Sequence, residues 1–565
     1  MNGRTFEQSN SRTPLVPGVD PVALEIMKGA FKAITDEMGI ALQKASYSPN
    51  IKTRMDHTCS IFDGTRQLLA QTAHQIGHLG AMPFVIKSVL KEHPPETWRP
   101  GDGVLVNDPY RGGTHIPDII LVSPVFHGDR LWGFVASLAH HSDVGGMAPG
   151  SMAGTAHEIF QEGLRIPSIH LLREGKIQEE MLKFILANVR TPEERKGDLA
   201  AQIAANNLGI RRLQELLQRY GPDRLQDIAT EVIDYAERRM RAAIVKMPDG
   251  VLRGEDFMDD RGNSDTPIRL AATITKKGDT LTIDFTGTDP QVHGPTNASY
   301  YMTMSLVMYT LRCLMDPDIP QNEGCYRPVN LVIPEGTCLN CTFPTAVAAG
   351  WEIARRTIDV LCRAFLPAIP EKVPAGSCGA MNQVSFGGMN PVTGEPFAYY
   401  ETHGGGFGAR RTKDGMDGVH SVSNTLNTPV EELELFYPLT VERYQLREDS
   451  EGAGRLRGGL GLMRELTFHS DVTLSIIADR AKFRPWGIEG GHDAEGQRYA
   501  VLGPDGERRL GTKVMTRLKA GETLRIWTAG GGGVGNPRER NRALVERDVA
   551  DGKVSPERAR AVYGQ

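Results

Sequence analysis

The chain has 565 residues, 40% of them hydrophobic and 24% charged, and this composition is typical of a soluble globular protein with two to four domains. Its formal net charge of −5 comes from 64 basic and 69 acidic residues mixed along the chain, which argues against nucleic acid as a partner. There is no apolar run long enough for a bilayer and no secretory signal, and the seven cysteines are an odd number of scattered thiols, so we expect a cytoplasmic protein that does not bind a membrane.

The N-terminal part of the chain is predicted to be a disordered lead-in over residues 1–20 and an α/β domain over residues 21–250. A helix is predicted for residues 21–46, because proline suits its first position and apolar residues recur every four positions, at Val22, Ile26, Ala30, Ile34, Met38 and Leu42. Two further helices are predicted, one from about residue 192 to the Gly221–Pro222 break and one that ends near the turn at residues 247–250.

Beyond residue 250 the pattern changes toward strands. Residues 270–289 alternate around Gly278–Asp279, as in a hairpin, and helices are predicted over residues 300–315 and 353–365. We therefore expect a central mixed α/β region over residues 251–432 and a β-rich region over residues 433–565 with a short terminal helix. The predicted fold class is α+β, or mixed, with an N-terminal α/β unit followed by a β-rich, glycine-rich C-terminal half.

A hairpin with an unusual open end is predicted inside the N-terminal domain. Its strands are "DIILVSPVF" (residues 118–126) and "LWGFVASLAH" (residues 131–140). A three-residue loop centred on Asp129 would place Asp118 opposite His140, whereas a two-residue loop would shift this register by one. The predicted register gives one apolar face, which includes Trp132 and ends in Asp118 and His140, and it turns His141 to the other face.

These two residues and His115, which precedes Asp118 by three positions, are predicted to bind a divalent metal. Two imidazoles and a carboxylate suit Mn²⁺, Fe²⁺ or Zn²⁺ and leave coordination positions for water or substrate. The alternative is a structural hydrogen bond between histidine and aspartate that caps the hairpin. The clustering of histidine favours the metal site, since ten of the 15 histidines lie between His57 and His170.

Several other residues are weaker candidates for the same site. His74 and His78 have the spacing of metal ligands on a helix, although Gln75 replaces the glutamate of zinc proteases. His78 is a candidate for catalysis; the alternatives for both histidines are donors that support the metal ligands, or buried structural histidines. Asp56 is a candidate base or a residue that orients a ligand, or else an ordinary turn residue. Asp108 is likewise a candidate catalytic group or a turn residue ahead of Pro109.

Asp143 and His141, just beyond the hairpin, are expected to support the metal ligands from outside. Two glycine-rich segments, residues 404–408 and 530–535, lack the lysine and hydroxyl of a Walker A loop. They are interpreted as tight turns, with backbone anion sites as the alternative.

The chain resembles the hydantoinase B family. The stretches "DPYRGGTHIPD", "LAHHSDVGG", "GGGFGARRTKDGMDGVHS", "NTPVEELE" and "GAGRLRGGLG" carry the resemblance, which runs from about Pro21 to Tyr563. The family includes N-methylhydantoinase B subunits, the B half of ATP-dependent 5-oxoprolinases, and related subunits of acetone-type carboxylases.

The resemblance implies a partner and a division of labour. A hydantoinase A-type subunit would use ATP and Mg²⁺ to activate a cyclic amide, or a ketone and bicarbonate, in a hetero-oligomer such as A2B2. In the carboxylase relatives the matching subunit holds a divalent metal, and the matching residues here are His115, Asp118 and His140. The resemblance therefore implies that the N-terminal α/β unit binds a divalent metal, and the ligand types suit Mn, Zn or Fe.

The preferred interpretation is the metal-bearing B subunit of an ATP-dependent hydrolase that opens a hydantoin- or oxoproline-like ring. An ATP-dependent carboxylase of the acetone or acetophenone type is the alternative within the family. Two functions of other classes stay open as alternatives. One is a non-haem iron oxygenase, which also uses two histidines and a carboxylate, and the other is a non-catalytic scaffold subunit.

Overall fold

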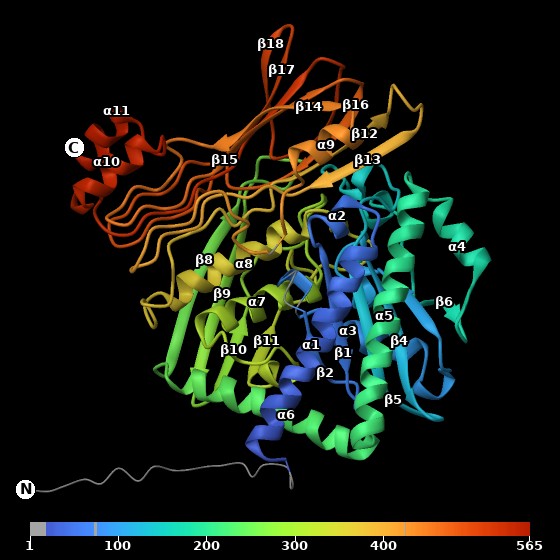
Figure 1. The fold of residues 1–565 in the computed structure, drawn as a ribbon. Coiled ribbons are helices and arrows are strands. Elements are labelled where there is room, and N and C mark those ends of the chain that lie inside the picture. The colour runs from blue at the N-terminus through green and yellow to red at the C-terminus, as the bar shows by residue number, and fades with distance from the viewer. Residues whose placement is uncertain (1–18, 73–75, 79, 424) are drawn as a thin grey trace, which may run out of the picture.

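The computed structural model describes residues 19–72, 76–78, 80–423 and 425–565. Most of the expected lead-in over residues 1–20, and also His74, lie outside the described residues. Where the chain is described, four sheets are combined with helices, which confirms the mixed fold class (Figure 1). No helix among these residues has the length and apolar composition that a membrane span requires.

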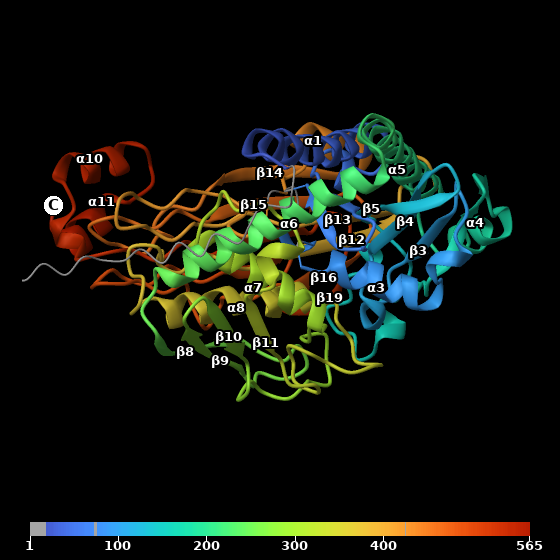
Figure 2. The ribbon, with the colours of Figure 1, turned by 90° about the horizontal axis from the view of Figure 1, so that it is seen from below.

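A seven-stranded antiparallel sheet forms the centre of the N-terminal part, with the spatial order β2-β1-β5-β4-β3-β6-β7. Its strands are β1 (His57–Phe62), β2 (Leu68–Gln71), β3 (Gly103–Val106), β4 (Asp118–His127), β5 (Arg130–His140), β6 (Ile169–Arg173) and β7 (Lys176–Ile177). Helices α1 (Pro21–Ala45), α5 (Pro192–Tyr220) and α6 (Pro222–Val245) lie on one side of this sheet (Figure 2). Their apolar side chains pack with those of β1 and β5. Those of α3 (Met82–Glu92) pack with β3 and β4 in a second cluster, so both faces of the sheet are buried.

The predicted N-terminal helix is confirmed, but the apolar stripe predicted for it is partly wrong. The carboxylate of Asp20 caps α1 by accepting hydrogen bonds from the backbone N–H groups of Val22 and Ala23, both at 2.8 Å. Val22 and Ile26 are nevertheless 69% and 60% exposed. Because a helix turns once every 3.6 residues, a strict spacing of four drifts around its surface, and the buried face instead follows Leu24, Met27, Phe31, Ile34, Met38 and Leu42.

The two helices predicted near residues 192 and 222 are also confirmed, with the break at the predicted place. Gly221 separates them at φ +75°, a conformation that favours glycine, and Pro222 occupies the first turn of α6. The face of α5 that contacts the sheet is partly polar. Gln202 donates to the backbone carbonyls of Ile119 (3.0 Å) and Ser137 (3.1 Å), so this side chain ties α5 to both strands of the hairpin.

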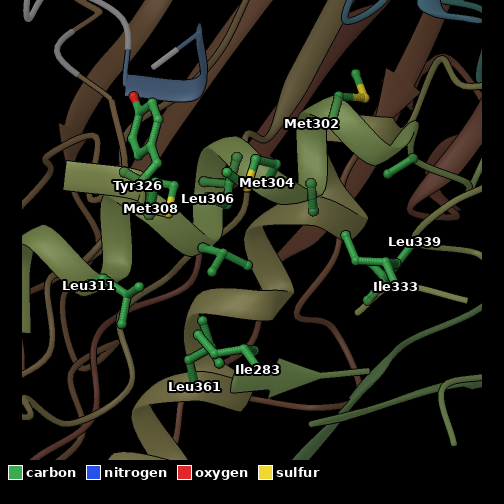
Figure 3. Packing of buried hydrophobic residues seen from close by; sticks show 14 of the residues in the cluster. Ile283, Met302, Met304, Leu306, Met308, Leu311, Tyr326, Ile333, Leu339 and Leu361 are labelled. Carbon is green, nitrogen blue, oxygen red and sulfur yellow. The ribbon is translucent and has the colours of Figure 1, made fainter. Parts of the chain in front are cut away.

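The central region contains a four-stranded sheet with the order β11-β10-β9-β8. Its strands are β8 (Gly250–Met258), β9 (Ile268–Lys277), β10 (Thr280–Asp284) and β11 (Val329–Val332), and the predicted hairpin around residues 278–279 is confirmed. Helices α7 (Tyr300–Leu314) and α8 (Gly350–Phe365), both predicted, pack beside it. Figure 3 shows methionine and leucine side chains of α7 that belong to the same buried cluster as Ile283 of β10 and Leu361 of α8.

One hydrophobic cluster joins the regions that the sequence pattern separates. It contains Phe62 from the N-terminal sheet, Ile283 from the central sheet and Trp486 from the C-terminal region. The boundaries at residues 250 and 432 therefore stay predictions.

Strands dominate the C-terminal part, as predicted. Two sheets, ordered β13-β12-β16-β19 and β14-β15-β20-β17-β18, share a hydrophobic cluster. Their strands are β12 (Gln383–Met389), β13 (Pro396–Glu401), β14 (Leu439–Leu446), β15 (Leu462–Phe468), β16 (Val472–Ile477), β17 (Arg498–Gly503), β18 (Gly506–Leu510), β19 (Lys513–Leu518) and β20 (Thr523–Trp527). The shorter helices are α2 (Pro49–Lys52), α4 (Glu179–Leu186), α9 (Val430–Phe436), α10 (Arg542–Ala550) and α11 (Pro556–Arg558), the last two beside the C-terminus (Figure 1).

The two glycine-rich segments are not the tight turns that were expected. They lie side by side and are joined by backbone hydrogen bonds. Gly406 N–H donates at 3.0 Å to the carbonyl of Ala529, next to the second segment, and Ala409 N–H, next to the first segment, donates at 2.9 Å to the carbonyl of Gly532. A Cβ at Gly531 would lie 2.2 Å from Phe407 O. Glycine is needed here because backbones pack directly on backbones.

Candidate metal centre

The predicted hairpin is formed by β4 and β5, and Asp118 faces His140 across its open end, as predicted. The turn itself is shorter than expected, since only residues 128–129 lie between the strands. A β-bulge next to Val125 absorbs the additional residue and restores the predicted register toward the open end. Trp132 was predicted on the face of Ile120 but packs in the opposite cluster, with α1 and α6, because it lies at this bulge.

His115, Asp118 and His140 come together at the open end of the hairpin. One nitrogen from each imidazole and one carboxylate oxygen lie within 4.8 Å of one another. His115 Nδ1 lies 2.7 Å from Asp118 Oδ2, and His140 Nδ1 lies 3.3 Å from Asp118 Oδ1. All three residues are at most 2% exposed, so the cluster is shielded from bulk water.

The donor atoms of this cluster fit a divalent metal. The Nε2 atoms of His115 and His140 are buried and have no hydrogen-bond partner among the described residues. Buried polar nitrogens are almost always paired, so these two nitrogens are available to bind an ion or a water. Two imidazoles and a carboxylate are the ligand types of Mn²⁺, Fe²⁺ and Zn²⁺.

The electrostatics of the cluster favour metal-binding protonation states. Burial alone would raise the pKa of Asp118, but His115 and His78 beside it hold this pKa well below its usual range. Burial lowers the pKa of His78 and of His140 more than the neighbouring carboxylates raise it. At neutral pH Asp118 is therefore a carboxylate, and the imidazoles of His78 and His140 are uncharged.

Two of the three catalytic candidates line the same small cavity. His78, in the 3₁₀ turn Ile76–His78, has Nε2 at 3.7 Å from Asp118 Oδ1 and Nδ1 at 3.1 Å from the hydroxyl of Thr58. Asp56 precedes β1, and its backbone carbonyl accepts a hydrogen bond from His140 N–H at 3.0 Å. Burial would raise the pKa of Asp56, but His140, His78 and Arg54 lower it below its usual value, so Asp56 is ionised.

The opposite wall of the cavity comes from residues that the sequence analysis did not identify. They are Trp351 and Arg355 of α8, Met381, and Tyr400 of β13. The ring of Tyr400 stacks on His140, with centroids 4.5 Å apart and planes inclined by 22°. Gly77 makes room for Trp351, because a Cβ at residue 77 would lie 2.8 Å from its ring. The spacing of Trp351 and Arg355, which places both on one face of a helix, was the only available signal.

The remaining candidates do not line the cavity. Asp108 caps the turn Pro109–Arg111 by accepting from Tyr110 N–H at 3.0 Å. The carboxylate of Asp143 accepts from the N–H groups of Gly145 and Gly150, both at 3.0 Å, and pairs with Arg190 at 2.9 Å. His141 Nε2 lies 3.0 Å from Gln202 Oε1, on the face that carries α5.

Comparison with known proteins shows the family to which this chain belongs. Residues 20–537 match the family model of hydantoinase B/oxoprolinase. An uncharacterised protein of Methanocaldococcus jannaschii is 41% identical over 95% of this chain and 94% of its own length. The putative B subunit of a D-/L-hydantoinase from Pseudomonas sp. strain NS671 is 35% identical over 97% of this chain and 95% of that protein. 5-Oxoprolinase 1 of Arabidopsis thaliana is 37% identical, but the match covers only 43% of the plant protein.

Two solved structures are similar along most of the chain. The ATP-dependent caprolactamase from Pseudomonas jessenii has a TM-score of 0.90 and 30% identity over 97% of this chain and 96% of that chain. Nucleotide-free acetone carboxylase has a TM-score of 0.89 over 96% of this chain and 79% of that chain, but at 22% identity this similarity shows the fold alone. Together, the match over residues 20–537 and these nearly full-length relatives show that the chain belongs to the hydantoinase B/oxoprolinase family.

Proposed function

We propose that the chain is the metal-binding B subunit of a heteromeric, ATP-dependent amidohydrolase that opens a cyclic amide of the hydantoin or 5-oxoproline type. The observation that carries the proposal is the buried cluster of His115, Asp118 and His140, whose donor atoms lie within 4.8 Å of one another. A hydantoinase B subunit and an ATP-dependent caprolactamase among the similar proteins support this choice of reaction.

In this proposal His115, Asp118 and His140 hold Mn²⁺, Zn²⁺ or Fe²⁺. A bound divalent cation would polarise a substrate oxygen and lower the pKa of water. Asp56, which is ionised and lines the cavity, accepts the proton of the attacking water. His78 lies beside Asp118 and keeps that carboxylate oriented.

ATP-dependent activation belongs to a partner in this proposal. The glycine-rich segments of this chain lack the lysine and hydroxyl of a Walker A loop, and their backbones are occupied by packing on each other. A hydantoinase A-type subunit would bind ATP and Mg²⁺, in a hetero-oligomer such as A2B2. Asp143 and His141 would act from outside the cavity, by fixing the loop and the helix α5 that adjoin the hairpin.

The test is turnover by the chain mixed with its A-type partner, with 5-oxoproline, hydantoin and caprolactam as substrates. We expect ring opening that requires ATP and both subunits, and that is lost in His140→Ala. Incorporation of ¹⁴C-bicarbonate into a ketone would instead identify a carboxylase. ATP-independent consumption of O2 by the chain alone would identify an oxygenase, and full activity of His140→Ala would leave the histidines a structural role.

A further inference from the structure

Arg355 is a buried cation without an ion pair. It is 3% exposed, it lines the cavity of the metal centre, and among the described residues its guanidinium forms neither a salt bridge nor a hydrogen bond. The neighbouring Arg356, on the same helix, lies 3.2 Å from Asp479 and 3.6 Å from Asp256. The carboxylate of Glu352, one turn before Arg355, is already used by the backbone N–H groups of Met381 and Asn382.

Such a residue needs a partner, and the part of the chain that the structure describes supplies none. Burying a charge is costly unless it is paired and hydrogen-bonded, and a guanidinium has five N–H donors to satisfy. Its planar fork matches two oxygens of a phosphoryl or carboxylate group. The shape of the donor set therefore points to an oxyanion.

The charge of the cavity leads to the same conclusion. The charged groups that line it are Asp56, Asp118 and Arg355. With a divalent cation bound between His115, Asp118 and His140, the two carboxylates and the guanidinium leave about one unit of positive charge in a space shielded from water. An anionic ligand would neutralise it.

Helix α8 lines both this cavity and a larger hollow. Trp351 and Arg355 line the metal cavity, while Ile358, Asp359 and Cys362 of the next turns line a hollow of about 560 Å³. The metal cavity itself has room of about 10 Å³, which suffices for an ion or a water. An anion enters only when a lining side chain moves, and the thioether of Met381 is flexible and has no hydrogen bond to lose.

We infer that Arg355 binds the anionic group of the activated substrate, a phosphoryl or carboxylate group, beside the metal ligands. The inference rests on the proposed function, because it takes the substrate to be an anion once it has been activated. Arg355 then orients the reacting group toward the metal centre and Asp56.

Calorimetric titration of the full-length chain with inorganic phosphate and with acetate tests the inference, with and without added metal. In Arg355→Met we expect the anion to bind about 10- to 100-fold more weakly, which is the range for hydrogen bonds to charged groups. Arg355→Lys keeps the positive charge but loses the planar pair of N–H donors, so its affinity for the anion should lie between those of the wild type and Arg355→Met. Arg363→Met, on the same helix but 40% exposed, should bind like the wild type. A preference for phosphate would identify a phosphoryl ligand, and a preference for acetate a carboxylate.

Equal anion binding by the wild type and Arg355→Met would overturn the inference, as would a wild type that binds neither anion. Metal content separates this failure from failure of the proposed function, since Arg355→Met should retain its metal. If Arg355→Met does not fold, crystals of the wild type soaked in arsenate, an analogue of phosphate, test the same inference. An anomalous peak within hydrogen-bond distance of the Arg355 guanidinium supports the inference, and a peak elsewhere or no peak refutes it.

Discussion

A buried ion pair holds the strand that presents Tyr400 to the metal centre. Glu401, at the end of β13, lies 2.5 Å from Arg464 through Oε2, and its Oε1 accepts from Thr428 N–H at 2.7 Å and Asn427 Nδ2 at 3.0 Å. Glu401 and Arg464 are 1% and 0% exposed. Burial alone would raise the pKa of Glu401, but Arg464, His403 and Arg54 lower it from 4.5 to about 2. Replacing Glu401 by Gln should therefore weaken the whole protein.

The stability that Glu401 contributes follows from the lowering of its pKa on folding. A pKa that falls from 4.5 to about 2 on folding corresponds to about 3 kcal/mol of stability at pH 7. Because the folded pKa is the lower one, this contribution is complete above pH 4.5 and is lost as the pH falls toward 2. Glu401→Gln also leaves Arg464 buried without a counter-charge, and breaking such a pair costs roughly 3–5 kcal/mol.

Urea unfolding of the wild type and Glu401→Gln between pH 7 and pH 3.5 measures this difference. We expect the gap in unfolding free energy to be about 3 kcal/mol or more at pH 7 and to narrow by roughly 1.4 kcal/mol at pH 3.5. Glu395→Gln, at the exposed residue just before the same strand, is the control and should stay within about 0.5 kcal/mol of the wild type. A gap that does not change with pH, or a variant as stable as the wild type, would refute this reasoning.

Three further predictions concern the surroundings of the metal centre. Gln202→Leu should lower the free energy of unfolding by roughly 1–3 kcal/mol, because two buried carbonyls lose their hydrogen-bond donor. Gln218→Leu, at an exposed position of the same helix, should not lower it, and urea unfolding measures both variants. Tyr400→Leu should weaken metal binding about 2- to 12-fold, the equivalent of roughly 0.5–1.5 kcal/mol of ring stacking, and Tyr400→Phe should not, as competition with a fluorescent chelator would show. The chelator dipicolinate should lower the free energy of unfolding of the wild type by about 2.7 kcal/mol, if the free metal had been at 100 times its dissociation constant, and should leave His140→Ala unchanged. Thermal melting measures both, and equal shifts in the melting temperature of the two proteins would contradict this.

The sequence pattern of the hairpin predicts its strand register but not its turn. Alternation over β4 and β5 sufficed to pair Asp118 with His140, because a buried face strongly specifies strand register. The turn could not be predicted in the same way. A two-residue turn combined with a β-bulge gives the same register as a three-residue loop, and only the position of Trp132 distinguishes the two.

The other wall of the site depends on contacts between distant parts of the chain. Tyr400 stacks on His140 across 260 positions of sequence, and Arg355 lies on a helix whose apolar pattern predicts only that it is a helix. Such contacts follow from the way in which helix α8 and strand β13 come together around the open end of the hairpin. For the same reason the polar face of α5 was not anticipated, since Gln202 is explained only by the backbone carbonyls that it meets.

Metal content tests the central claim most directly. The wild type, His140→Ala and His127→Ala are purified after growth with added Mn, Fe and Zn and measured by plasma mass spectrometry. His127 is the matched control, because it lies on the same hairpin but at the turn end, opposite Arg130 and away from the cluster. We predict near-stoichiometric metal in the wild type and His127→Ala and its loss in His140→Ala. No metal in the wild type, or equal metal in His140→Ala, would contradict a metal centre at the open end of the hairpin.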